Sequence, residues 1–258
     1  MNVANGALEE LVGFLIFMIL IAAFVYFLWR VAANRSLPLR PIAAYDALKN
    51  LLSRAAEAGK PVHISIGTAG AGDATTVDTT AGLYALEFLA DRAAVSAIPP
   101  IVTVSDPTAL PVAQDRLRRS YQRQGYPEEY DPRQVREIAP SVYGSTVAYG
   151  AGVMDVLTHE RVMANVMIGT FGDEFLLIGE TGAQLGLLQA GGTSKTQVLP
   201  FVYTSITHPV IGEEIYAAGA YLSGRRTHIA SLLAQDTVRG AIVIIVVLLA
   251  LVHWAGLI

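Results

Sequence analysis

The chain has 258 residues, of which 53% are hydrophobic and 16% charged, and its formal net charge is −4 at pH 7. It contains no cysteine, which excludes disulfides, thiolate nucleophiles and cysteine-ligated zinc. Nucleic-acid binding is disfavoured, because acids outnumber bases and the largest basic cluster is Arg116, Arg118 and Arg119. The five histidines lack ligand spacing, so we predict no metal site.

Two uninterrupted apolar runs lie near the ends of the sequence, at residues 11–29 and 240–258. As a helix with a rise of ~1.5 Å per residue, each run is long enough to cross a hydrocarbon core of ~30 Å. We therefore expect a transmembrane helix at each end, the lipid bilayer as a partner, and a short extracytoplasmic tail at residues 1–10. A cleaved signal peptide is the competing interpretation of the first run, but Glu9 and Glu10 stand where a signal peptide carries positive charge.

Basic residues flank the two runs on their inner sides, and the tails outside the runs carry none. Positive charge close to a span is retained on the cytoplasmic side of a membrane. We therefore expect the central domain to face the cytoplasm. The basic residues that carry this prediction are Arg30, Arg35, Arg40, Lys49, Arg225, Arg226 and Arg239.

The central part of the sequence predicts an α/β domain at residues 61–224, with a Rossmann-like, mostly parallel sheet and flanking helices. A juxtamembrane linker with an amphipathic helix at residues 30–60 precedes it, and an amphipathic connector at residues 225–239 follows it. The first half of the domain has the order of a βαβ unit. Its predicted elements, counted from the linker, are a helix at 41–58, a strand at 62–66, a helix at 79–95, a strand at 101–104 and a helix at 109–124.

A polar, proline-containing segment at residues 125–140 then divides the domain into two lobes or forms an exposed loop. Beyond it we predict a small-residue-rich helix at residues 141–157. The other predicted elements are strands at 164–168, 175–178 and 198–204, helices at 181–188 and 209–222, and an amphipathic segment at 227–238 that continues into the second apolar run.

A glycine-rich loop after the first strand is the best candidate for a ligand site, because glycines let backbone amides approach an anion at a helix N-terminus. The pattern GxGxxG is incomplete, since Thr75 holds the third glycine position and Asp73 would repel a phosphate. A tight turn with polar caps on the next helix is the alternative. The candidate ligand-binding residues are Gly67, Thr68, Gly70, Gly72, Asp73, Thr76, Ser105 and Asp106.

A glycine-threonine motif occurs twice in the domain. Gly67-Thr68 and Gly169-Thr170 each follow an apolar stretch and are followed two residues later by another glycine. Duplication of a half-domain and a chance match both account for this similarity.

No catalytic motif is complete, because GxSxG, HExxH and an obvious acid/base pair are all missing from the sequence. We therefore predict a membrane-anchored, non-enzymatic scaffold or assembly subunit. The alternative is a membrane-tethered binder or hydrolase of a nucleotide-like or other anionic small molecule that uses residues 67–73. The sequence identifies no cofactor.

Small residues at close to helical spacing predict a self-association face in the helix at residues 141–157, and with it a homo-oligomer or a place in a larger membrane complex. Packing of this face inside its own domain is the alternative. The residues are Gly144, Ala148, Ala151 and Gly152.

Four stretches between residues 61 and 224 resemble an uncharacterised family of membrane-anchored bacterial proteins, known as a domain of unknown function. They are SIGTAGAGDATTVDTTAGL, IPPIVTVSDPT, IGTFGDEFLLIGETG and LPFVYTSITHPVIGEEIYAAGAYL. The resemblance implies the boundaries of the central domain and a place in the inner membrane of a bacterium. It implies no catalytic residue.

Overall fold

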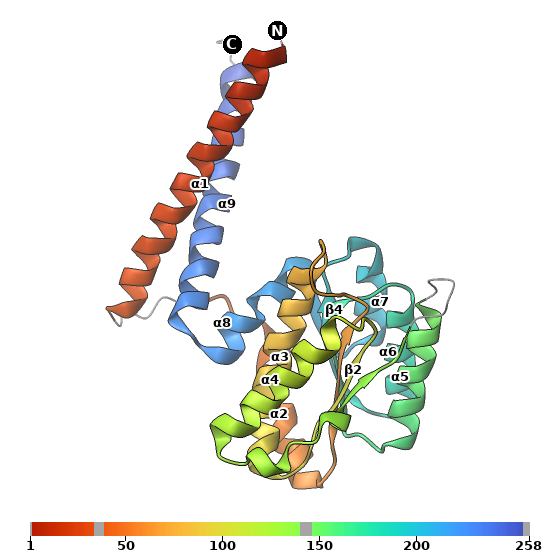
Figure 1. Ribbon diagram of the computed structural model, residues 1–258. Helices are drawn as coiled ribbons and strands as arrows, with labels where there is room; N and C mark the ends of the chain where they lie inside the picture. Colours follow the sequence, from red (N-terminus) through yellow and green to blue (C-terminus); the bar gives the residue numbers. More distant parts are fainter. Residues whose placement is uncertain (1, 34–38, 140–145, 255–258) are drawn as a thin grey trace. The chain divides into compact units, whose positions relative to one another are not determined.

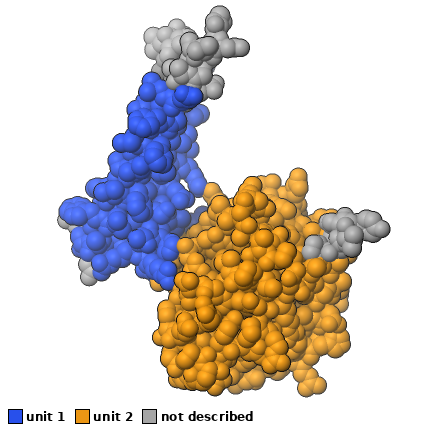
Figure 2. All heavy atoms as spheres, in the orientation of Figure 1, with its two compact units in different colours: residues 1–40, 224–258 blue, residues 41–223 orange. Residues whose placement is uncertain are grey.

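The computed structural model describes residues 2–33, 39–139 and 146–254. The chain forms two compact units, shown in Figure 2. The terminal unit consists of Met1–Arg40 and Gly224–Ile258, and the α/β unit consists of Pro41–Ser223.

The terminal unit consists of two long helices, α1 (Asn2–Ala32) and α9 (Arg226–Trp254), which pack against each other (Figure 1). By length and composition, both are long and apolar enough to cross a membrane, over Gly13–Ala32 and Arg226–Val247. The second of these stretches begins well before residue 240. This is because α9 runs unbroken from the amphipathic connector into the apolar run, as the sequence predicts.

The α/β unit is built on a six-stranded sheet in the order β3-β2-β1-β4-β5-β6. All five pairs of neighbouring strands are parallel, so the predicted α/β class with a parallel sheet is confirmed. Parallel sheets bury both faces, and β1, β2 and β4 are buried along their whole length. The strands are β1 (Val62–Gly67), β2 (Ile101–Val104), β3 (Val135–Glu137), β4 (Ala164–Thr170), β5 (Leu188–Thr193) and β6 (His208–Ile211).

Helices cover both faces of the sheet (Figure 1). On one face lie α2 (Ala43–Ala58), α3 (Thr76–Ser96) and α4 (Ala109–Gln124), and the short α8 (Ala218–Ser223) packs on α3. On the other face lie α5 (Val147–His159), α6 (Glu174–Gln184) and α7 (Leu199–Ser205). Four 3-10 helices among the described residues complete the fold, at Pro127–Glu129, Pro132–Gln134, Thr196–Val198 and Gly212–Ala217.

The first half of the fold follows the sequence closely. The predicted bounds of β2 and α4 are correct, and those of α2, β1 and α3 are shifted by at most three residues. The periodic apolar residues of α2 account for this agreement, since Tyr45, Leu48 and Leu52 all face the core. Gly59, in the left-handed conformation at φ 62°, ends the helix.

Several predictions for the second half are wrong. The strands predicted at 175–178 and 198–204 are the helices α6 and α7, because a short apolar run does not distinguish a buried helix from a buried strand. The helix predicted at 181–188 overlaps only the end of α6. The helix predicted at 209–222 is replaced over residues 209–217 by β6 and the 3-10 helix Gly212–Ala217, and only α8 (Ala218–Ser223) remains of it.

Three strands, β3, β5 and β6, were not predicted from the sequence. β3 lies within the polar segment at residues 125–140 and pairs with β2 at the edge of the sheet. β5 contains Gly191 and Gly192, which have low strand propensity. The neighbouring backbones leave no room for a side chain at either position. A Cβ at Gly191 would lie 2.0 Å from Met167 O in β4, and one at Gly192 would lie 1.7 Å from Val210 O in β6.

We predict that Gly192→Ala lowers the free energy of unfolding by about 3 kcal/mol, near the upper end of the usual cost of overpacking, since the added Cβ must push β6 away. Gly186→Ala is the matched control, because no atom lies within 4 Å of its Cβ and only its φ of +69° opposes the change, at about 1 kcal/mol. Denaturant unfolding of the full chain measures both values. Equal losses would contradict the close contact between β5 and β6.

Candidate functional site

The strand order reverses between β1 and β4, and the loops that follow these strands meet at the carboxyl edge of the sheet. Ligands of open α/β sheets bind in the crevice at such a point. Thr68 N–H donates to Thr170 O over 2.8 Å, and Ser105 N–H donates to Gly67 O over 3.1 Å. Gly67 pairs with Thr170, so the two glycine-threonine motifs lie on neighbouring strands.

Side-chain hydroxyls occupy amides of the glycine loop. Ala71 N–H donates to Thr108 Oγ1 over 2.8 Å. The N–H groups of Gly72 and Asp73 both donate to Thr76 Oγ1, over 2.8 and 3.0 Å. These three amides, which an anion-binding loop would direct at its ligand, are therefore bound by the protein itself.

Two carboxylates lie at the glycine loop, one within it and one in the segment after β2. Asp73 Oδ1 accepts the N–H of Thr75 over 2.8 Å, and the hydrogen bonds from Thr75 hold the pKa of Asp73 below its usual range. Asp106 Oδ1 accepts the N–H of Thr108 over 2.8 Å. A Cβ at Gly70 would lie 2.8 Å from Asp106 Cγ, so the structure brings Asp106 against the glycine loop.

Asp78, in the first turn of α3, accepts hydrogen bonds from three hydroxyl groups. Its side chain accepts hydrogen bonds from Thr170 Oγ1 (2.5 Å), Ser194 Oγ (2.7 Å) and Tyr216 OH (2.6 Å). Only 7% of Asp78 is exposed. The partners come from the ends of β4 and β5 and from the segment after β6, so one carboxylate joins α3 to three parts of the sheet edge. No sequence signal indicates this convergence.

Glu174, at the start of α6, is not predicted as a site residue, because the apolar residues that follow it favour a strand at 175–178. The side chain is fully buried, and its Oε1 accepts the N–H of Gly172 over 2.7 Å. Its Oε2 has no hydrogen-bond partner in the described part of the chain. Buried carboxylates without a full set of partners are costly and often mark functional sites. No group of three or more potential metal ligands occurs among the described residues.

A row of buried polar side chains crosses the sheet on the face covered by α5, α6 and α7. His63 in β1 is opposite Asn165 in β4, and Asn165 is opposite Gln189 in β5. His63 Nδ1 lies 2.8 Å from Asn165 Oδ1, and Asn165 Nδ2 donates to Gln189 Oε1 over 3.1 Å. On the other side, His63 Nε2 lies 3.0 Å from Thr103 Oγ1, which is 3.2 Å from Tyr149 OH.

The hydrogen bonds of Gln189, at one end of this row, determine which ring nitrogen of His63 carries the proton. Gln189 Nε2 donates to backbone carbonyls of α6 and α7 over 2.8 and 3.0 Å, so its oxygen faces Asn165. Asn165 then presents its own oxygen to His63, which carries its proton on Nδ1 and accepts the Thr103 hydroxyl at Nε2. Burial lowers the pKa of His63 to about 4, against the weaker upward effect of its hydrogen bond to Asn165.

The residues predicted for self-association lie in different surroundings. Gly144 falls outside the described residues. Ala151 is exposed on α5, and Ala148 is half-buried. A Cβ at Gly152 would lie 2.5 Å from Ile138 Cγ2, so Gly152 packs against its own chain.

The chain belongs to the family described as Domain of unknown function (DUF6754), which matches residues 5–256. This confirms the resemblance found in the central domain and extends it over both terminal helices. No curated protein and no solved structure matches the chain.

We predict that acid destabilises the protein through His63. Its pKa is about 4 in the fold and ~6.5 when unfolded, so between these values the unfolded chain binds more protons. Stability is therefore lost as the pH falls through this window, by about 1.4 kcal/mol per unit. The measurement is the free energy of unfolding at pH 7 and pH 5. His63→Gln should lose about 2 kcal/mol less between these two pH values than the unaltered chain, and equal losses would contradict the assignment.

Proposed function

We propose that the chain is a scaffold or assembly subunit anchored in a membrane by α1 and α9, with the α/β unit in the cytoplasm. The sheet has the strand order of the Rossmann fold, in which the switch point is the usual ligand site. The observation that carries the proposal is that donors at this point are already bound by hydroxyls of the protein, at Ala71, Gly72 and Asp73. A loop whose amides are bound within the protein keeps one conformation without a ligand, as a scaffold requires.

The alternative from the sequence is an anionic ligand at residues 67–73, and the contacts of the loop count against it. A phosphate would have to displace the hydroxyls of Thr76 and Thr108 from the loop amides. It would also meet the carboxylates of Asp73 and Asp106, at a cost that no cation in the loop offsets.

The outer surface of α5 and α6 supports the assembly part of the proposal. Val147 and Leu177 are 51% and 40% exposed, and Ala151 is exposed as well. A Cβ at Gly150 would lie 3.8 Å from Leu177 Cδ1, so Leu177 packs beside the backbone of α5. Adjoining apolar groups on a surface mark candidate sites of protein association. We define Val147, Ala148, Ala151 and Leu177 as the α5/α6 face.

The membrane part of the proposal rests on α1 and α9. Both are long and apolar enough to span, and Trp29 and Tyr26 suit an interfacial belt at the inner end of α1. The arginines on the inner sides of the spans favour a cytoplasmic α/β unit. Following the resemblance found in the sequence, we propose the inner membrane of a bacterium.

Ala151→Arg should dissociate the assembly, because it places a charge in the α5/α6 face without disturbing a buried group. The measurement is the mass of the complex purified in mild detergent. Val95→Arg, at an apolar position of α3 that is 61% exposed, is the matched control and should leave the mass unchanged. Gly152 is unsuitable as a probe because it packs against Ile138. A monomer for the unaltered chain, in detergent and in native membranes, would overturn the proposal.

The proposed orientation predicts the reactivity of introduced cysteines, which are unique because the chain has none. Glu128→Cys, in the polar segment of the α/β unit, should resist a membrane-impermeant thiol reagent in intact cells and react after lysis. Asn5→Cys, before the first span, should react in intact cells. The reverse pattern would show that the α/β unit faces outward.

A further inference from the structure

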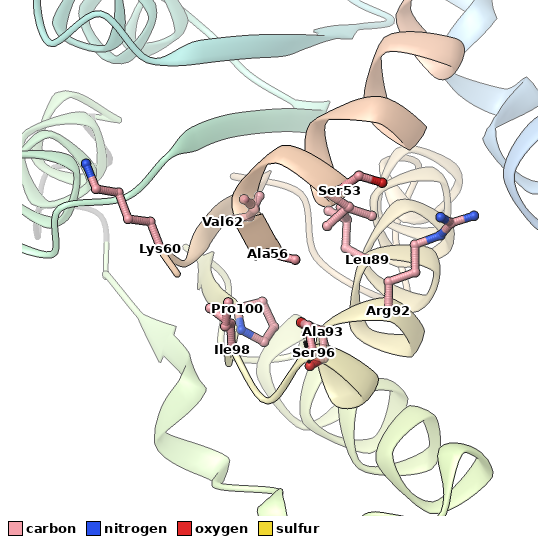
Figure 3. A pocket seen from close by; sticks show the side chains of 12 residues that line it. Ser53, Ala56, Lys60, Val62, Leu89, Arg92, Ala93, Ser96, Ile98 and Pro100 are labelled. Atoms are coloured by element: carbon pink, nitrogen blue, oxygen red, sulfur yellow. Dashed lines mark hydrogen bonds between the residues drawn. The ribbon is translucent and has the colours of Figure 1, made fainter. Parts of the chain in front are cut away.

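A pocket of about 150 Å³ lies in the α/β unit, away from the carboxyl edge of the sheet (Figure 3). It is formed where the last turns of α2 and α3 meet the starts of β1 and β2. Most of its lining is apolar. The apolar residues are Leu52, Ala55, Ala56, Val62, Leu89, Ala93, Ile98 and Pro100.

Two serines, Ser53 and Ser96, and two cations, Lys60 and Arg92, complete the lining, and no acid is among the lining residues. Figure 3 shows Lys60 and Arg92 extending on opposite sides of the pocket, with the apolar residues between them. Arg92 lies over the Phe88 ring, 4.4 Å from its centroid. Within the described residues, neither Lys60 nor Arg92 forms an ion pair. Both side chains are exposed, and Figure 3 shows their charged ends directed outward from the apolar residues, so an anion can pair with either of them at the rim of the pocket.

The size of the pocket limits the apolar part of a ligand. An apolar cavity of about 150 Å³ holds a group the size of benzene. Small-molecule sites are typically apolar with a few polar groups that set orientation. Here those groups are positively charged, so the complementary ligand carries a negative charge next to a small apolar group.

We propose that this pocket binds a small carboxylic acid whose apolar part is about the size of a benzene ring. The apolar group packs against Ala56, Leu89 and Pro100, and the carboxylate pairs with Lys60 or Arg92 at the rim. Because the two cations stand on opposite sides, one carboxylate reaches only one of them. Loss of a single cation is then partly compensated by the other. This binding requires neither membrane insertion nor assembly.

The test is calorimetric titration of the full chain in lipid nanodiscs with 3-phenylpropionate, with empty nanodiscs as the blank. We expect saturable binding with one site per chain. The alcohol 3-phenylpropanol should bind about 5-fold more weakly, and acetate should not bind, because each lacks one of the two recognised features. Failure of the acid to bind at millimolar concentration, or equal affinity of acid and alcohol, would overturn the proposal.

Variants locate the site. Ala56→Phe fills the pocket from an exposed position of α2 and should abolish binding of acid and alcohol alike. Lys60→Gln combined with Arg92→Gln should reduce the affinity for the acid to that for the alcohol and leave the alcohol unaffected. Arg119→Gln, at an exposed arginine outside the pocket, should change neither affinity.

Two further results would reject the proposed site or ligand. Unchanged binding of the acid in both pocket variants would place it elsewhere. Binding of a peptide with a C-terminal phenylalanine, but not of 3-phenylpropionate, would show that the ligand is a protein terminus. Thermal unfolding of each variant checks that it is folded, and the charge variant tests the pocket separately if Ala56→Phe is unstable.

Discussion

The close approach of β1 and β4 at their carboxyl ends determines how the rest of that edge is built. A Cβ at Gly67 would lie 2.1 Å from Thr170 O, and one at Gly169 would lie 1.9 Å from Ile66 O. Both glycines also have positive φ, +84° and +153°, so space and backbone conformation each require glycine. With the strand ends this close, the chain leaves both strands at adjacent points, and the two following loops start side by side.

The polar groups of the loop after β1 are satisfied by the start of α3 and by the segment after β2. Backbone amides in a turn need acceptors, and the hydroxyls of Thr76 and Thr108 supply them. Asp78 does the converse, since its carboxylate accepts hydroxyls from three other segments. Three loop amides and three hydroxyls at this edge are thus bound by the protein itself, whereas the pocket lined by Lys60 and Arg92 lies elsewhere on the α/β unit.

The helices and strands that could be predicted are those whose bounds are set by residues adjacent in the sequence. β2 and α4 lie between prolines, glycines and polar turns, and their bounds follow from those residues alone. β5 could not be found this way, because Gly191 and Gly192 weaken its strand pattern and only the backbones of β4 and β6 explain them. The place of Ser105 and Asp106 at the carboxyl edge of the sheet could be predicted because they directly follow β2. Asp78 could not, since its partners are distant in sequence.

The buried polar row shows how much of the fold depends on groups that look unremarkable in the sequence. His63 is one polar residue in an apolar strand, and only in the sheet does it lie opposite Asn165, with Gln189 beyond. An apolar face tolerates a slip of two residues between strands. Here a slip would bury imidazole and amide groups without partners, at about 1–3 kcal/mol for each. The row therefore fixes the register of β1, β4 and β5, and with it the level at which the loops after these strands begin.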